Sequence, residues 1–276
     1  VLMDQKTGYV KAISGGRGAK TANLTLNRAT NTPRQPGSTF KVISAFAPAL
    51  DTCGATLGTV YYDSIYSVGN KTFNNWYGQK YTGYSSIRDG IIYSMNIVAV
   101  RCLMETVSPQ LGLEYAENFG ITTLTSQDLG ASQALGGLTH GTTNLELTSA
   151  YAAIANEGIY TRPVFFTKIL DHDGKILINN EPETHRVLKD STAFLLTDAM
   201  AGSMETNRKF GSSINSTSAR ANIPGMSNAG KSGTTSKNND IWFVGYTPYY
   251  TAGIWAGCDN NQKLTAQNGG TSFHKN

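Results

Sequence analysis

Cysteine is scarce in this chain, and the little that is present argues against a metal-binding or dithiol function. The three cysteines, Cys53, Cys102 and Cys258, are an odd number, lie far apart and form no C-x-x-C pair. No histidine stands near them at the spacing of a metal ligand. We therefore interpret all three as small apolar side chains, and we predict neither a metal nor a cofactor.

The sequence also lacks a long apolar run and a dense run of one charge. Its most apolar stretch, IIYSMNIVAV at 91–100, is too short and too polar to span a membrane, and no leader-like segment opens the chain. The net charge of +4 is scattered, which does not favour a nucleic-acid partner. With 39% hydrophobic and 15% charged residues in 276, the chain is long and apolar enough to bury a core.

The two ends of the chain are rich in β patterns and the middle is rich in helical ones. A turn at QKTG separates two apolar runs in residues 1–14, and three further β-rich runs fill residues 228–257. Apolar residues recur at helical spacing at 38–50, 87–106, 111–120, 144–158 and 191–205, with a break near Ser94. Two short strands flank DHDGK, while 51–85 and 207–225 show no sustained period, so we expect irregular loops there.

This order predicts one α+β domain over 1–276. We expect the opening hairpin and the three final runs to form a five-stranded antiparallel sheet, flanked by the helices and a helical subdomain between them. No internal repeat or linker divides the chain.

A serine and a lysine open the first predicted helix. In QPGSTFKV (35–42), Ser38 follows a Pro-Gly break and Lys41 stands three residues later, on the same face of a helix. Serine is a common capping residue and lysine a common surface residue, so this pair taken alone favours a capped, solvated helix over a catalytic pair.

Two further short patterns also bring hydroxyl, amide and amine side chains close together. Ser94 and Asn96 stand at the helix break, and Lys231-Ser232-Gly233-Thr234 lies along a predicted strand. A glycine inside a strand often marks the close approach of another backbone, and we expect that backbone to belong to a bound peptide.

Each of these patterns has decoys elsewhere in the chain. Ser272-x-x-Lys275, Ser213-x-Asn215, Ser236-x-Asn238 and Lys6-Thr7-Gly8 fit the same spacings, but they fall in turns, loops or the chain end. Only the set at 38, 94 and 231 combines the right order with a helix start, a helix break and a strand.

The sequence resembles the transpeptidase domain of bifunctional, class A penicillin-binding proteins. The resemblance is carried by four stretches, 27–41, 81–96, 134–158 and 230–248, and extends over nearly the whole chain. Ser232 stands where that family usually has threonine, which keeps the hydroxyl. The resemblance also implies an upstream glycosyltransferase domain and a membrane anchor that this chain does not contain, and a location on the extracytoplasmic face of the cell membrane.

The resemblance implies a D,D-transpeptidase that cross-links peptidoglycan stem peptides through an acyl-enzyme on Ser38. Lys41 would accept the serine proton, which requires a neutral amine. Ser94 would carry a proton, and Asn96 would hold the substrate amide or Lys41. Lys231 would remain charged and bind the substrate carboxylate together with the hydroxyls of Ser232 and Thr234.

The main-chain N–H groups of Ser38 and Thr234 would stabilise the oxyanion, with Gly233 leaving room for the peptide. β-Lactams would enter the same path and stall. Trp76 either contacts substrate at the mouth of the cleft or packs the irregular segment. Glu146 is open to interpretation as a deacylating base, but a carboxylate at a helix start is commonplace.

Two other functions remain open from the sequence. A D,D-carboxypeptidase or serine β-lactamase would use water in place of the acceptor amine, and the lifetime of the acyl-enzyme separates this reading from a transpeptidase. A non-catalytic penicillin-sensing domain is the third reading, although the intact lysines at 41 and 231 argue against it. Stem peptides and β-lactams are the expected ligands, with cell-wall synthesis proteins as partners of the parent protein.

Overall fold

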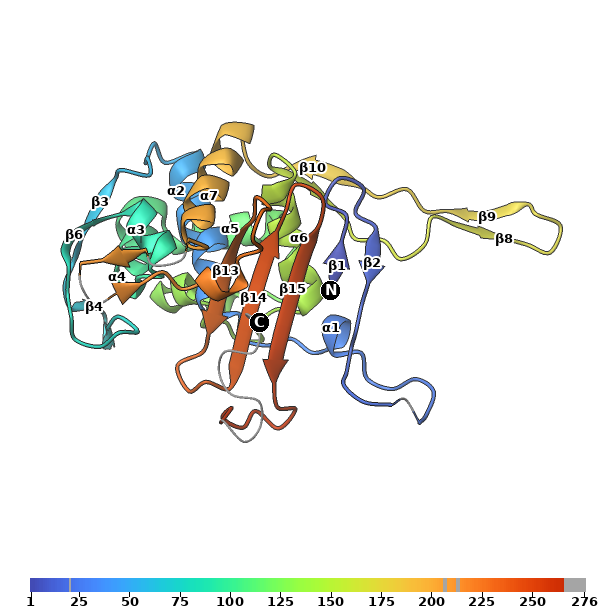
Figure 1. The fold of residues 1–276 in the computed structure, drawn as a ribbon, viewed down its shortest axis with the longest axis horizontal. Coiled ribbons are helices and arrows are strands. Elements are labelled where there is room, and N and C mark those ends of the chain that lie inside the picture. Colours follow the sequence, from blue (N-terminus) through green and yellow to red (C-terminus); the bar gives the residue numbers. More distant parts are fainter. Residues whose placement is uncertain (20, 206–207, 212–213, 266–276) are drawn as a thin grey trace.

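A five-stranded antiparallel sheet forms the centre of the computed structural model, which describes residues 1–19, 21–205, 208–211 and 214–265. The strand order is β13-β14-β15-β1-β2, so both chain ends contribute to one sheet (Figure 1). The strands are β1 (Leu2–Met3), β2 (Val10–Ala12), β13 (Ala229–Thr234), β14 (Asp240–Tyr246) and β15 (Thr251–Gly257). The predicted α+β class and sheet are confirmed, and β13 lies at an edge of the sheet.

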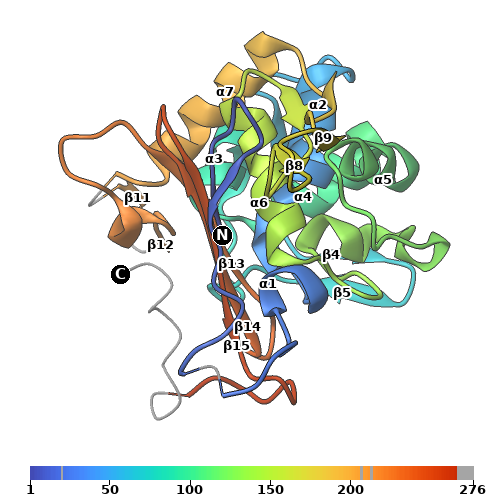
Figure 2. The ribbon, with the colours of Figure 1, turned by 90° about the vertical axis from the view of Figure 1, so that its right-hand side faces the viewer.

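Most of the helices cover one face of this sheet, as Figure 2 shows with the sheet seen nearly edge-on. The longer helices are α5 (Pro109–Asn118), α6 (Asn144–Ala155) and α7 (Asp190–Gly202). Shorter ones are α1 (Arg28–Asn31), α2 (Ala47–Asp51), α3 (Ile87–Ile92) and α4 (Asn96–Arg101).

Helix α6 lies in the core because it is apolar on nearly all sides. Its residues from Leu147 to Ile154 are all buried, and the Tyr151 hydroxyl donates to the carbonyl oxygen of Thr39 at 2.7 Å. Burial raises the pKa of Tyr151 well above the usual value of a tyrosine, so the phenol remains neutral and acts as a donor. Helix α6 thereby supports the segment that begins at Ser38.

The predicted helix at 38–50 is helical throughout but not uniformly α-helical. It begins as a 3-10 turn, η1 (Gly37–Thr39), passes through a π-helical stretch, η2 (Val42–Phe46), and ends as α2. Isolated π-helical turns are frequent at functional sites. The predicted break near Ser94 is confirmed, since α3 ends at Ile92 and α4 begins at Asn96.

The prediction of irregular structure was wrong in two places. Within 51–85, β3 (Val60–Asp63) pairs with β6 (Gly83–Ser86), and β4 (Tyr66–Val68) pairs with β5 (Lys71–Phe73). Within 207–225, β11 (Lys209–Phe210) pairs with β12 (Ile214–Asn215). These strands have two to four residues, too few to establish a period-2 pattern in the sequence.

A hairpin around DHDGK projects from the body of the molecule (Figure 1). It consists of β8 (Lys168–Leu170) and β9 (Ile176–Asn179), as predicted, and every residue of both strands is exposed. At its base, β7 (Ile159–Thr161) pairs with β10 (Thr184–Arg186). Across the described ranges, no helix combines the length and apolar character that crossing a bilayer requires.

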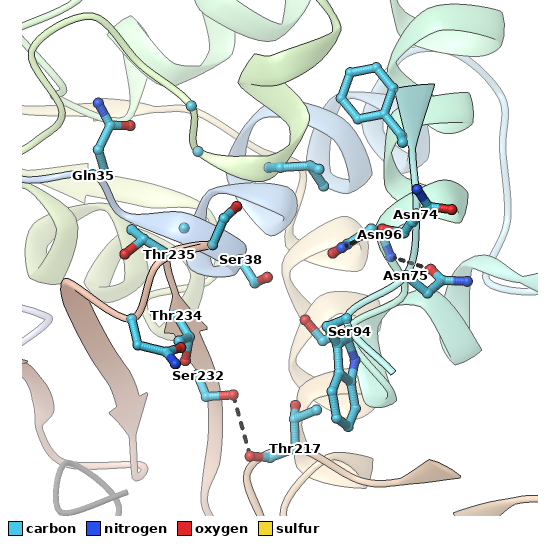
Figure 3. Close-up of a pocket in the computed structure, with 18 of the residues that line it drawn as sticks. Gln35, Ser38, Asn74, Asn75, Ser94, Asn96, Thr217, Ser232, Thr234 and Thr235 are labelled. Carbon is cyan, nitrogen blue, oxygen red and sulfur yellow. Dashed lines mark hydrogen bonds between the residues drawn. The ribbon is translucent and has the colours of Figure 1, made fainter. Parts of the chain in front are cut away.

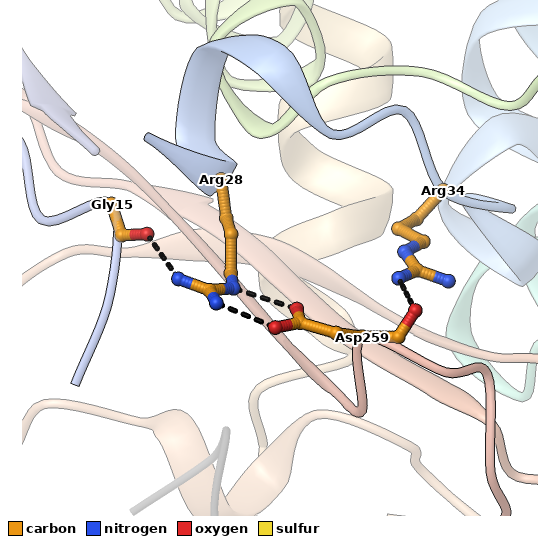
Figure 4. A network of polar contacts seen from close by, with 4 residues as sticks. All are labelled: Gly15, Arg28, Arg34 and Asp259. Carbon is orange, nitrogen blue, oxygen red and sulfur yellow. Dashed lines mark hydrogen bonds and ion pairs between the residues drawn. The ribbon is translucent and has the colours of Figure 1, made fainter. Parts of the chain in front are cut away.

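Two arginines tie the segment that leads to Ser38 to the loop after β15 (Figure 4). The Arg28 guanidinium donates to both carboxylate oxygens of Asp259, at 2.7 and 2.5 Å, and to the Gly15 carbonyl at 3.3 Å. Arg34 donates to the carbonyl oxygen of Asp259 at 2.8 Å, and its guanidinium lies 5.3 Å from the ring centroid of Trp255. The approach to the first predicted helix is therefore anchored to the sheet.

Candidate active site

The backbone just before Ser38 is held from two sides. The indole N–H of Trp242, on β14, donates to the Gln35 carbonyl at 2.8 Å. The Gln35 side chain accepts from the Leu138 N–H at 2.8 Å and donates to the Leu138 carbonyl. These bonds fix the position at which the 3-10 turn carrying Ser38 begins.

The turn that carries Ser38 packs directly against β13, with glycine on both sides of the contact. A Cβ on Gly37 would lie 2.9 Å from the Thr234 carbonyl oxygen, and a Cβ on Gly233 would lie 2.5 Å from the Pro36 carbonyl oxygen. Both distances are too short for a side chain. The two glycines therefore allow the backbones of Ser38 and Thr234 to lie next to each other.

Lys41 is fully buried one turn after Ser38. Its amine lies 2.6 Å from both the Ser94 carbonyl oxygen and the Asn96 Oδ1, and 3.2 Å from the Ser94 hydroxyl. Burial, followed by the charge of Lys231, holds the pKa of Lys41 well below the usual value of a lysine. A neutral amine here keeps a lone pair, which is what proton abstraction requires.

Ser94 stands between two buried lysines. The Lys231 amine donates to the Ser94 hydroxyl at 2.8 Å and to the Ser232 carbonyl at 2.9 Å. Ser94 adopts φ = 54°, in the left-handed region that non-glycine residues seldom occupy. Such strain persists only where the surroundings hold it, and it is concentrated at functional sites.

These elements border one groove of about 890 Å³. In Figure 3, Ser38 lies between β13, which carries Ser232 and Thr234, and the segment that carries Ser94 and Asn96. Sequence-predicted residues that line the groove are Ser38, Trp76, Ser94, Asn96, Ser232 and Thr234. Lys41 and Lys231 are not among the lining residues, but the amines of both contact the Ser94 hydroxyl, which lines the groove. Gly233 forms the contact between β13 and the turn at Ser38.

The groove is electropositive. Lys71 and Arg220 are among the residues that line it, the buried Lys231 lies next to Ser94 in its wall, and no aspartate or glutamate is among the described lining residues. Field lines from cations concentrate in a cleft and attract anionic ligands. The arrangement therefore suits a substrate that carries a carboxylate.

Trp76 both fastens its own loop and lines the groove. Its indole N–H donates to the Tyr93 carbonyl at 2.9 Å, which fastens its loop, while the side chain lines the groove and is 53% exposed. The exposed face is therefore available to a bound ligand.

Glu146 lies in a structural contact. Its carboxylate accepts from the Thr143 N–H at 2.9 Å and from the Thr122 N–H at 3.0 Å, forming a capping box at the start of α6. It is not among the residues that line the groove. This geometry favours a helix cap over a deacylating base.

The sequence reasoning missed several residues that border or support the groove. Asn74, Asn75 and Thr217 line it, and the buried Asp63 lies behind Asn75. Ser236 and Asn238, predicted to lie in a loop apart from the site, also line the groove from the turn after β13. The other decoys at 213 and 272–275 fall wholly or partly outside the described residues. The one sequence signal for these residues is that Asn74 and Asn75 directly precede Trp76, in a stretch without a sustained period.

The sequence of residues 1–273 matches the family model for the penicillin binding protein transpeptidase domain. The chain belongs to this family, and the resemblance noted from the sequence is confirmed. Penicillin-binding protein 1A of Clostridium tetani is 33% identical over 97% of this chain and 35% of its own length. Penicillin-binding protein 1A of Clostridium botulinum strain Hall is 35% identical over 96% of this chain and 32% of its own length.

Solved structures give the same result. PonA1 from Mycobacterium tuberculosis, in a structure with penicillin V, aligns with a TM-score of 0.82 and 25% identity over 99% of this chain and 73% of that one. The chain spans about a third of the length of the curated relatives above.

Proposed function

We propose that this chain is a D,D-transpeptidase domain that cross-links peptidoglycan stem peptides and is acylated by β-lactams at Ser38. The observation that carries the proposal is that Ser38 and Ser94 line one groove, and that the Ser94 hydroxyl joins the buried amines of Lys41 and Lys231, with the pKa of Lys41 lowered. Membership of the penicillin-binding transpeptidase family supports it. Two assignments are parts of this proposal: Ser38 is the nucleophile, and the substrate ends in D-alanyl-D-alanine.

The first step is attack by the Ser38 hydroxyl oxygen on the carbonyl carbon of the penultimate D-alanine. The proton of Ser38 moves to the lone pair of neutral Lys41 as the new C–O bond forms. The resulting oxyanion accepts from the N–H groups of Ser38 and Thr234, whose backbones lie side by side. Each such donor contributes about 3 to 4 kcal/mol to transition-state stabilisation.

The second step breaks the C–N bond of the terminal peptide link. Ser94 contacts both lysine amines, so its hydroxyl can pass a proton from Lys41 to the departing amine while Lys231 holds it in place. Terminal D-alanine leaves as a neutral amine. An acceptor amine from a second stem peptide then attacks the ester, and its proton returns to Ser38 by the same route.

The carboxylate of the substrate is assigned to the region between Lys231, Ser232 and Thr234. Ser232 and Thr234 line the groove on edge strand β13, and the charge of Lys231 lies directly beneath. An extended peptide can add to the free edge of β13 by main-chain hydrogen bonds. In the proposed complex, a carbonyl would lie next to Ser38 and the terminal carboxylate farther along the strand.

The longer relatives suggest a larger setting. We propose that the natural protein adds a glycosyltransferase domain and a membrane anchor, and that this domain acts on the extracytoplasmic face of the membrane, next to its peptidoglycan substrate. The proposal rests on similarity to penicillin-binding proteins about three times as long as this chain.

Intact-mass measurement tests the function. Incubation with benzylpenicillin should add the mass of one antibiotic, the adduct should persist for minutes or longer, and Ser38→Ala should remain unmodified while unfolding at the same temperature. In a separate incubation without antibiotic, the protein should join a peptide ending in D-alanyl-D-alanine to an added D-amino acid. Release of the adduct within seconds would instead establish a β-lactamase, and transfer of the peptide only to water a carboxypeptidase.

A further inference from the structure

A buried asparagine outside the predicted catalytic set caps the helix that carries Asn96. Asn75 is 5% exposed, and its Oδ1 accepts from the Asn96 N–H at 2.9 Å and from the Ile97 N–H at 3.2 Å. Met95, at the N-cap position of α4, provides no capping hydrogen bond from its side chain. The first N–H groups of a helix need an acceptor, and here Asn75 supplies it from the loop after β5.

The orientation of the Asn75 amide is set by a buried carboxylate. Asp63 is 1% exposed, and one of its oxygens accepts from the Asn75 side-chain Nδ2 at 2.7 Å. The other oxygen accepts from the N–H and the hydroxyl of Thr82, at 3.0 and 2.8 Å. A carboxylate only accepts hydrogen bonds, so the NH₂ of Asn75 must face Asp63 and its oxygen must face α4.

The same loop also fixes the side chain of Asn96. The Asn96 Nδ2 donates to the Asn74 carbonyl at 2.9 Å, and the Asn96 Oδ1 lies 2.6 Å from the Lys41 amine. With its NH₂ engaged by Asn74, Asn96 presents its oxygen to Lys41. A reversed amide would set the Asn96 oxygen against the Asn74 carbonyl oxygen, two acceptors without a hydrogen between them, and lose that bond.

We infer that Asp63 and Asn75 are positioning residues for the amine of Lys41, an inference that rests on the proposed function of Ser38 and Lys41. The chain of contacts runs from the Asp63 carboxylate through the Asn75 amide to the start of α4, and from Asn96 to Lys41. It holds the acceptor of Lys41 in place, and so directs the lone pair of the amine at the serine proton.

Removal of the Asn75 amide tests the inference. Asn75→Ala leaves two N–H groups of α4 and one oxygen of Asp63 without their partner, so we expect Asn96 to shift away from Lys41. A displacement of about 1 Å near a reacting group slows a reaction roughly 100-fold. The second-order rate constant for acylation by a fluorescent penicillin should fall by about that factor.

A matched control separates positioning from loss of stability. The Ser108 hydroxyl accepts from the Leu111 N–H at 3.2 Å at the start of α5, and Ser108 does not line the groove. Ser108→Ala therefore also removes a helix cap, and its acylation rate constant should stay within about twofold of wild type, as substitutions away from the site do.

A reciprocal exchange keeps the test decisive even if Asn75→Ala does not fold. Asn75→Asp alone sets two buried carboxylates against each other and should acylate slowly. Adding Asp63→Asn restores one donor and one acceptor across the pair, so the double variant should recover at least tenfold over Asn75→Asp. A merely structural role predicts no such recovery in the rate constant measured on folded protein.

The results distinguish the inference from the proposed function. If wild type is never acylated, the proposed function fails. If wild type is acylated but folded Asn75→Ala reacts at the wild-type rate, or the exchange gives no recovery, the positioning role is wrong and the proposed function stands.

Discussion

Two segments of this chain carry nearly the same three residues in very different surroundings. Lys6-Thr7-Gly8 forms the turn between β1 and β2, where Lys6 is exposed. Lys231-Ser232-Gly233 lies within β13, where Lys231 is fully buried and its amine reaches Ser94. The difference between the two lies in what each lysine contacts.

Burial is what gives the second triplet a chemical role. An exposed ammonium is hydrated and screened, so it perturbs its neighbours little. The buried Lys231 acts in a medium of lower dielectric constant, where it lowers the pKa of Lys41 and would attract a carboxylate strongly. Under the proposed function, these residue types would act in catalysis only where the fold has removed the water.

Lysine replacement gives the largest expected difference between the segments. Lys231→Ala removes a charged donor to Ser94 and to the substrate carboxylate, a loss of about 3 kcal/mol, so acylation should slow by roughly 100-fold or more. Lys6→Ala should leave the rate unchanged. Stopped-flow labelling with a fluorescent penicillin measures both, and equal rates for the two variants would remove the distinction.

Glycine replacement separates stability from activity. Gly233→Ala places a Cβ 2.5 Å from the Pro36 carbonyl oxygen, and Gly8→Ala places one 2.6 Å from the Arg162 carbonyl oxygen. Each should destabilise the fold by about 1 to 3 kcal/mol, measured by urea unfolding. Only Gly233→Ala should also slow acylation, by about tenfold or more, because it moves the turn that carries Ser38. A comparable loss of rate in Gly8→Ala would count against this explanation.

The pH dependence of acylation tests the coupling between the buried lysines. Lys41 must be neutral to accept the proton, so the rate should rise with pH as Lys41 loses its proton. Burial and the charge of Lys231 both lower that pKa. In Lys231→Met the charge is absent, so the pKa of Lys41 should rise. The ascending limb of the plot of acylation rate against pH should then move to higher pH. Lys6→Met should leave the limb in place, and an unmoved limb in Lys231→Met would show that Lys41 is not the base.

Ser232→Thr gives the smallest expected effect and makes the two triplets identical in sequence. Ser232 is 6% exposed, and its hydroxyl donates to the Thr217 carbonyl at 3.3 Å. Threonine retains that hydroxyl, so acylation should stay within about threefold of wild type, a change below about 1 kcal/mol. A loss approaching that of Lys231→Ala would mean that the added methyl group disrupts the groove.

Much of the fold was predictable because its signals are local. The helices at 109–118, 144–155 and 190–202 overlap the predicted helical stretches at 111–120, 144–158 and 191–205, and the pairing of both chain ends follows from β-rich runs that need partners. Ser38, Ser94 and Lys231 were found because each belongs to a short motif in a recognisable setting. Their convergence needed the fold, since 137 residues separate Ser94 from Lys231.

The residues that support the site were not predictable from local pattern. Asp63 and Asn75 lie on short strands and turns within 51–85, where no period shows, and their role depends on contacts with α4. Buried polar residues of this kind resemble ordinary loop residues in a sequence. Strain at Ser94 is likewise a property of the assembled structure.

The site of covalent attachment tests the central claim most directly. Tryptic cleavage after Arg34 and Lys41 isolates residues 35–41, which contain Ser38, and cleavage after Arg88 and Arg101 isolates residues 89–101, which contain Ser94. After incubation with benzylpenicillin, mass spectrometry should find the adduct on 35–41, with fragment ions at Ser38. An adduct on 89–101, or on any peptide remote from the groove, would contradict the assignment of Ser38 as the nucleophile.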